Sequence, residues 1–161
     1  MSGAHFEPLA NVTCVALGDR GLMIEGPPGS GKSTLALLLI DRGAQLVGDD
    51  GVMLERRGGD IWTHPPDAIR GLIEVRGAGI VEFPAVSARL TLILRLDPNA
   101  SRVPEIEKRS LLDIALPAIA FRTGDAAQAL RAEQMGVAAM AVRFQEFYCQ
   151  GDLEEMLISG M

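Results

Sequence analysis

The residues that decide the fold of this chain are Gly26, Pro27, Pro28, Gly29, Ser30, Gly31, Lys32 and Ser33. They match the phosphate-loop pattern G-x-x-x-x-G-K-[ST] at every fixed position. The apolar run 22–24 precedes them and indicates a buried strand. The apolar run 34–40 follows and indicates a buried helix that ends at Gly43. A strand, this loop and a helix form the arrangement in which the motif binds a nucleotide.

The composition of the loop has a physical cause. Glycines let successive backbone N–H groups turn inward and surround an anion, and the positive end of the following helix points at the same anion. Lys32 supplies a charge for the β- and γ-phosphates, and the Ser33 hydroxyl can bind Mg²⁺. A glycine-rich turn without a ligand would need neither group. We therefore predict that residues 26–33 and Thr34 bind ATP with Mg²⁺.

The composition limits what else the chain can be. With 161 residues and 48% apolar content, we expect one domain over 1–161, with a mobile N-terminus over 1–10 and a helical segment over 125–161. The net charge of −6 argues against binding to nucleic acid. We find no membrane-spanning run and no signal segment, so we expect a cytoplasmic protein. Cys14 and Cys149 are expected to be buried free thiols rather than a disulfide.

The predicted elements give an α/β fold. Two apolar runs, 12–17 and 22–24, are joined by a turn at 18–21, so the strand before the loop should be the second arm of an antiparallel hairpin. Further predictions are a strand at 45–47, a hairpin of 52–55 with 61–63, a half-buried strand at 89–96, a surface loop at 97–110, a strand at 111–121 with Pro117 at an edge or bend, and helices over 125–148 and from Asp152.

Three carboxylates are candidates for the chemistry. Asp49 and Asp50 end the strand after the loop helix, where ligands of such sheets lie. Adjacent strand residues point to opposite faces, so one carboxylate would meet the metal or the acceptor and the other would brace the site. A solvated turn is the alternative. Glu74 precedes Gly77 and Gly79, which would let a metal–phosphate centre approach closely; a surface pair of Glu74 with Arg76 is its alternative.

Together these features resemble the catalytic domain of HPr kinase/phosphorylase, in the short bacterial form without an extra N-terminal domain. The resemblance covers residues 11–121. It rests on the hairpin entering the loop, on the loop itself, and on the blocks LIDRGAQLVGDD (39–50) and IEVRGAGI (73–80), which are more specific than the loop. It implies a phosphate-loop sheet with antiparallel edge hairpins (HPr kinase / PEP carboxykinase-like), a C-terminal helix and a hexamer.

The resemblance also implies an activity and residue roles. Members of that family use ATP to phosphorylate a seryl hydroxyl on HPr, the phosphocarrier protein of the sugar phosphotransferase system, and can reverse the reaction by phosphorolysis. Lys32 would bind phosphate, Ser33 and Glu74 would bind magnesium, and Asp50 would be the acid/base. Asp49 would support Asp50, and we also assign it to the metal. Arg102 is the candidate for the family's loop arginine.

Three departures concern the reverse reaction and the strength of catalysis. Asn11 stands where the family has a histidine, and Thr34 stands where it has an acidic residue. Residues 122–126 replace the family's Arg-Pro-Gly-Arg-Asn, so Asp125 replaces an arginine. We therefore expect a kinase with weakened phosphorolysis. Two other functions stay open: a small-molecule phosphate-loop kinase, which would need a lid rich in arginines, and a nucleotide-binding regulatory module with eroded catalysis.

Overall fold

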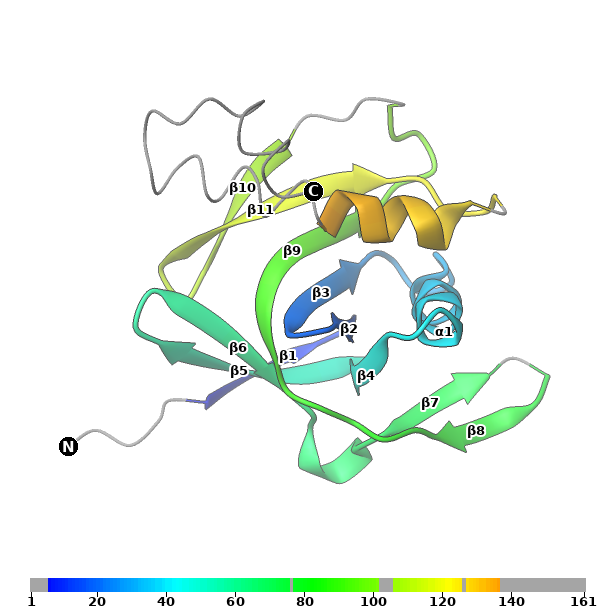
Figure 1. Ribbon diagram of the computed structural model, residues 1–161, viewed down its shortest axis with the longest axis horizontal. Coiled ribbons are helices and arrows are strands. Elements are labelled where there is room, and N and C mark those ends of the chain that lie inside the picture. The colour runs from blue at the N-terminus through cyan, green and yellow to red at the C-terminus, as the bar shows by residue number, and fades with distance from the viewer. Residues whose placement is uncertain (1–5, 76, 102–105, 126, 137–161) are drawn as a thin grey trace.

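The computed structural model describes residues 6–75, 77–101, 106–125 and 127–136, and these form a large mixed sheet with a small hairpin beside it and little helix (Figure 1). The elements are β1 (Phe6–Ala10), β2 (Val12–Leu17), β3 (Arg20–Glu25), α1 (Lys32–Asp41), β4 (Gln45–Gly48), β5 (Gly51–Arg57), β6 (Asp60–His64), a 3₁₀ turn (Asp67–Ile69), β7 (Leu72–Val75), β8 (Gly79–Glu82), β9 (Ala88–Leu96), β10 (Ile106–Leu111) and β11 (Ile114–Phe121). A further helical stretch covers 128–136. None of these described helices is long and apolar enough to cross a membrane.

β9 is the centre of the large sheet. It pairs in parallel with β3 and β11 and antiparallel with β6, and the sheet order is β1-β5-β6-β9-β3-β2-β4, with β10 beside β11. We predicted that 89–96 would be half-buried, and this is wrong. Leu92 and Leu94 pack into one core cluster while Leu90 and Ile93 pack into another. Adjacent strand residues point to opposite faces, so both faces of β9 are covered.

The hairpin that enters the phosphate loop is confirmed. β2 and β3 pair antiparallel from Val12–Glu25 to Leu17–Arg20, so the strand before the loop is the second arm. β4 then pairs with the other edge of β2, again antiparallel. The sheet order β3-β2-β4 therefore puts one strand between the strand that leads into the loop and the strand that leads to Asp49.

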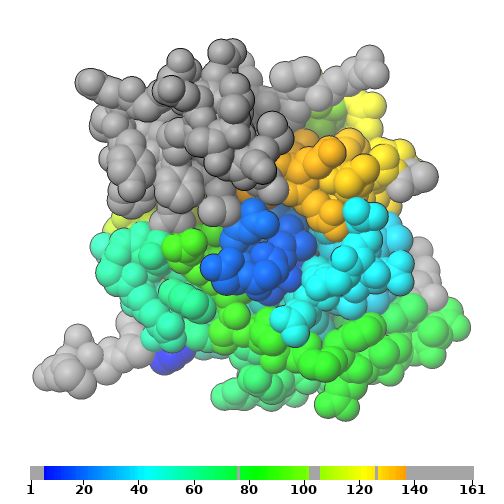
Figure 2. Space-filling view, viewed as in Figure 1, coloured from blue at the N-terminus to red at the C-terminus, as the bar shows by residue number. Residues whose placement is uncertain are grey.

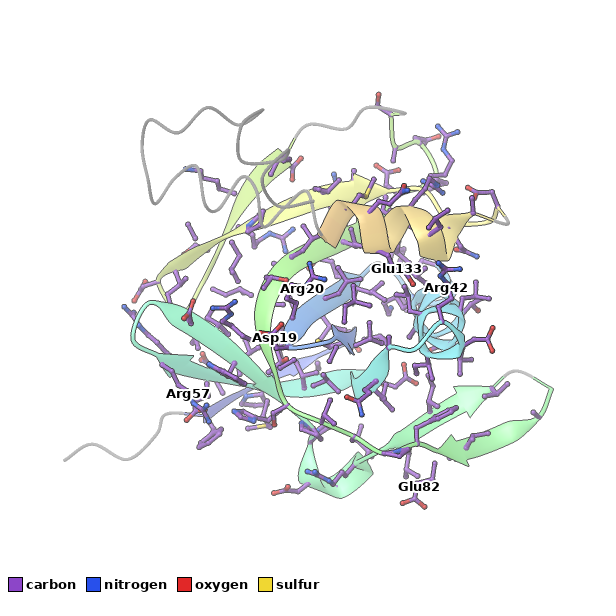
Figure 3. The ribbon with its side chains drawn as sticks, in the orientation of Figure 1. Asp19, Arg20, Arg42, Arg57, Glu82 and Glu133 are labelled. Atoms are coloured by element: carbon purple, nitrogen blue, oxygen red, sulfur yellow. The ribbon has the colours of Figure 1, made fainter. Side chains whose placement is uncertain are left out.

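One core cluster lies between the sheet and the helices. Leu35 and Leu39 of α1 pack there with Ile24, Phe121 and Ala132. Figures 1 and 2 show α1 between the 128–136 stretch and the β7–β8 hairpin. Arg42 at the end of α1 and Glu133 face one another in Figure 3, with hydrogen bonds of 2.8 and 3.1 Å. α1 thus lies between the 128–136 stretch, to which its end is hydrogen-bonded, and the β7–β8 hairpin.

Several expectations about the ends of strands and of the chain need correction. Residues 6–10 are not a mobile terminus, because β1 pairs with β5 over five residues. Residues 106–110 are not loop, because β10 pairs with β11. Pro117 lies one residue before β11 begins to pair with β9, so its missing N–H is not needed in that ladder. Residues 137–161, which hold most of the predicted C-terminal helix and Cys149, lie outside the described residues.

Candidate functional site

The phosphate loop is shaped by glycines in a left-handed conformation. Gly29 has φ 77° and Gly31, the N-cap of α1, has φ 103°. Side chains rarely adopt these angles, which explains why glycine stands at both positions. Gly31 carries no side chain that could cap the helix, so the first N–H groups of α1 are left for a ligand. Glycines in the left-handed conformation and an uncapped helix start are features that the predicted anion site requires.

A cavity of about 390 Å³ lies against this loop. Its lining brings together the loop, the start of α1 and the three predicted carboxylates. The lining residues are Thr13, Pro28, Gly29, Ser30, Gly31, Lys32, Ser33, Thr34, Leu37, Asp49, Asp50 and Glu74. Gly26 and Pro27, which we also assigned to the nucleotide, lie on the other side of the loop and line a different cavity.

Lys32 marks one end of the loop. Its ammonium donates to the Gly26 carbonyl at 2.7 Å and approaches the Pro27 carbonyl at 3.4 Å. In phosphate loops the lysine meets the terminal phosphates, whereas the helix N-terminus meets the inner ones. The transferred phosphate is therefore expected near Gly26 and Pro27, and the rest of the nucleotide toward Thr34.

Asp49 holds the hydroxyl that we expect to bind the metal. Its Oδ1 accepts a hydrogen bond of 2.7 Å from Ser33 Oγ and one of 2.9 Å from Thr13 Oγ1. Thr13 is buried on β2, between the strand of the loop and the strand of the aspartates. Hydrogen bonds to a charged acceptor are about twice as strong as neutral ones. The contact fixes the Ser33 hydroxyl at the mouth of the loop.

Asp50 lies beside Asp49 on the wall of the same cavity, not on the opposite face of a strand as we predicted. The reason is that β4 ends at Gly48 and Asp50 turns the chain into β5 with φ 61°. The Asn11 N–H donates to the Asp50 carbonyl at 3.0 Å and supports this turn. Asp50 is exposed, so its carboxylate is available to a substrate hydroxyl.

Glu74 reaches the cavity from β7. Its neighbour Ile73 is buried in the core, and the alternation along the strand turns Glu74 outward to the cavity wall. Arg76, the partner in the alternative surface pair, lies outside the described residues, as does Arg102. Arg109 lines the other cavity, together with Gly26 and Pro27, and donates to both Glu25 oxygens at 2.8 and 2.6 Å.

The segment that replaces the family's C-terminal motif contacts the loop. Thr123 Oγ1 donates to the Ser30 carbonyl at 3.4 Å. Asp125 accepts from the Ala127 N–H at 2.9 Å and is paired with Arg131. The acid at position 125 is therefore partly neutralised by a neighbouring guanidinium.

Sequence reasoning did not single out Thr13, Leu37 or Thr123 as site residues. A threonine within the apolar run 12–17 was a usable signal for Thr13, but its partner Asp49 is far along the chain and no pattern joins them. The Ser30 hydroxyl is buried without a hydrogen-bond partner among the described residues. It lies against Gly26, where an added Cβ would come within 2.6 Å of it, so this hydroxyl occupies the space that a side chain at Gly26 would need.

The residues fit a magnesium ion that is shared with phosphate. Ser33, Asp49 and Glu74 offer oxygen atoms, which Mg²⁺ prefers, and all three line the cavity. Within the described part of the chain, no three His, Cys, Asp or Glu side chains gather closely enough to hold a metal by themselves. Magnesium commonly uses one or two carboxylates together with substrate phosphates and water, so this donor set is sufficient.

Known proteins match this chain in sequence and in fold. Residues 8–89 match the family model of the HPr Serine kinase C-terminal domain. The HPr kinase/phosphorylase of Bordetella pertussis is 40% identical over 103 residues, which are 58% of this chain and 33% of that protein. That of Clostridium perfringens is 44% identical over 66 residues, 41% of this chain and 22% of that protein. The chain thus spans a third or less of the length of these curated relatives.

A solved structure of the Hpr(Ser) kinase/phosphatase from Coxiella burnetii has the same fold. Its TM-score is 0.74 at 22% sequence identity, and the match covers 89% of this chain and 95% of that one. The family model, for its part, matches just over half of the present chain and includes the loop, both aspartates and Glu74. This chain therefore belongs to the HPr serine kinase C-terminal domain family.

Proposed function

We propose that this chain is a phosphotransferase that uses ATP and Mg²⁺ to phosphorylate a seryl hydroxyl on an HPr-type phosphocarrier protein. The observation that carries the proposal is the Ser33–Asp49–Thr13 contact beside Asp50 in one cavity. It joins a phosphate loop to a fixed metal-binding hydroxyl and to an exposed carboxylate. The names of the matched relatives support the choice of acceptor.

The proposed reaction needs three contributions from the chain. Lys32 and the N–H groups at the start of α1 neutralise the β- and γ-phosphates. Ser33, Asp49 and Glu74 would hold Mg²⁺, which supplies further positive charge to the transferring group. Asp50 accepts the proton of the seryl hydroxyl while the seryl oxygen bonds to the γ-phosphorus and the bond between the γ-phosphorus and the ADP oxygen breaks. Positioning and charge neutralisation are the main demands of phosphoryl transfer, and these groups meet them.

The test is transfer of label from γ-³²P-ATP. Purified HPr-type phosphocarrier protein, a panel of small hydroxyl acceptors and a sample without acceptor are compared with Mg²⁺ present. Label on a seryl residue of the carrier supports the proposal. Label on a small acceptor favours a small-molecule kinase, and tight ATP binding without any transfer favours the regulatory module.

Two variants test the residue roles. Lys32→Ala should lose nucleotide affinity, whereas Asp50→Asn should keep it and lose transfer. Asp19→Asn is the matched control, because Asp19 is an exposed aspartate in the turn at the opposite end of β3 from the loop (Figure 3). An Asp50→Asn protein with full turnover would remove Asp50 from the proposed base role.

We further propose that phosphorolysis is weak. Asn11, which lies against Asp50, carries no charge and exchanges no proton, and Asp125 places an acid in the segment next to the loop. Incubation of phosphorylated carrier protein with millimolar inorganic phosphate should release pyrophosphate much more slowly than the forward reaction consumes ATP. Brisk pyrophosphate release would contradict this.

A further inference from the structure

We propose that a second cavity, behind Gly26 and Pro27, receives an apolar side chain of the acceptor protein next to the hydroxyl that is phosphorylated. This inference rests on the proposed function and assigns part of its specificity. The cavity measures about 480 Å³, which is ample for a large aliphatic or aromatic side chain. Leu9, Met23, Leu96 and Leu111 contribute apolar lining.

The second cavity adjoins the place where the phosphate is transferred. Gly26 and Pro27 line it, and their carbonyls are the two that Lys32 contacts from the nucleotide side. The backbone of the first loop residues therefore separates the two cavities at the terminal-phosphate end. An acceptor that reaches the γ-phosphate from the side away from the nucleotide passes this wall.

The proposed base lies at the same junction. Asn11 lines the second cavity and its N–H donates to the carbonyl of Asp50, which lines the first. A hydroxyl bound at Asp50 is thus separated from the second cavity by a single residue, Asn11. The flanking side chain of a protein segment spans that separation, whereas a small hydrophilic acceptor does not fill both places.

The charges around the second cavity indicate a neutral occupant. Arg109 and Glu25 satisfy one another through two hydrogen bonds, and Arg95 is paired with Asp97 and Glu107 at 3.4 and 3.6 Å. No charged side chain in its described lining is left to attract an anion. Apolar lining with a rim of paired ions favours an apolar group. The nucleobase is not a candidate, because the inner phosphates direct it toward Thr34 on the other side of the loop.

The experiment compares Leu111→Gln and Leu9→Gln with the control Leu112→Gln. All three leucines are partly buried against the same core cluster, but Leu112 does not line the cavity. Steady-state transfer from ATP to HPr-type phosphocarrier protein is measured together with direct binding of fluorescently labelled carrier to each variant. Thermal melting identifies any variant that does not fold, and the two lining positions serve as replacements for one another.

We expect each lining variant to raise the KM for the carrier about tenfold, the loss for one buried aliphatic contact, with the KM for ATP changed less than about twofold. Leu112→Gln should behave as wild type. Folded lining variants with unchanged carrier KM and unchanged carrier binding would overturn the inference while leaving the proposed function intact. If wild type binds the carrier but transfers no phosphate, the proposed function fails; the binding series then decides the inference by itself. If wild type neither binds nor phosphorylates it, both are wrong.

Discussion

Gly48→Ala tests how closely the backbone of Gly51 approaches Gly48 in the turn that holds the two aspartates. A Cβ atom at Gly48 would overlap the Gly51 carbonyl oxygen and lie 3.1 Å from Val52 Cγ1 and 3.2 Å from Pro66 Cδ. The overlap is with backbone, so a rotamer change cannot relieve it. Overpacking of this kind typically costs 1–3 kcal/mol, and we expect about 3 kcal/mol at this buried position.

Gly51→Ala is the matched control at the other end of the same turn. The atom nearest to a Cβ there is the Leu9 carbonyl oxygen at 3.6 Å, an ordinary contact. Alanine restricts the unfolded chain more than glycine does, so this variant should be about 0.5 kcal/mol more stable than wild type. The two substitutions are chemically identical and should differ by about 3.5 kcal/mol.

Urea denaturation followed by the fluorescence of Trp62, the single tryptophan, measures both free energies of unfolding. Binding of ATP with Mg²⁺ is measured on the folded variants, because a displaced turn should loosen the Ser33–Asp49 hydrogen bond and weaken metal-dependent affinity. If Gly48→Ala and Gly51→Ala unfold at the same urea concentration, the described approach of Gly51 to Gly48 is wrong. If Gly48→Ala is destabilised but keeps full affinity, the turn and the site are not coupled.

Three further predictions concern buried polar groups. Burial raises the pKa of Cys14 from 9.0 to about 12, so thiol reagents should label Cys14 only after unfolding. The free energy of unfolding should fall as the pH rises from 9.0 to about 12, because the thiol then ionises in the unfolded chain but not in the folded one. A hydrogen bond from His64, and to a smaller extent one from Arg57, lowers the pKa of Glu55. The ionised carboxylate therefore stabilises the fold above its ordinary pKa, and this stabilisation is lost as the pH falls. The free energy of unfolding of Glu55→Gln should accordingly change less between roughly pH 6 and roughly pH 3 than that of wild type. Thr13→Val keeps the shape but removes a donor to Asp49, and urea denaturation should show a loss of about 1.5 kcal/mol.

The phosphate loop, the hairpin before it and the helix after it could be predicted because their signals are local. Glycines at fixed spacing, an apolar run and a turn lie next to one another in the sequence. The same holds for the hairpin of β5 and β6. In each of these elements, the residues that contact one another in space are also close together in the sequence.

The strands β1 and β10 could not be predicted, because their signals are weak without their partners. β1 contains Pro8 and is mostly exposed, and β10 carries Glu107, Lys108 and Arg109 in succession. Neither shows a clean alternation of apolar and polar residues, and both form because β5 and β11 offer free edges. Pairing with a distant edge is a tertiary effect that outweighs local propensity.

The placement of the aspartates shows why the antiparallel entry of β3 matters for the site. In the order β3-β2-β4, the strand that leads to Asp49 is not the neighbour of the strand that leads to the loop, and β2 lies between them. Asp49 is nevertheless linked to the loop, because Thr13 of β2 and Ser33 of α1 both donate hydrogen bonds to its Oδ1. Asp49 thereby holds the Ser33 hydroxyl, the group that we propose to bind the metal. Its neighbour Asp50, turned by its left-handed backbone toward the same cavity, accepts a main-chain hydrogen bond from Asn11, and its exposed carboxylate is the group that we propose for the incoming alcohol. Backbone geometry therefore gives two adjacent aspartates different surroundings, two side-chain hydrogen bonds at Asp49 and an exposed place on the cavity wall at Asp50, which the sequence Asp49-Asp50 alone does not reveal.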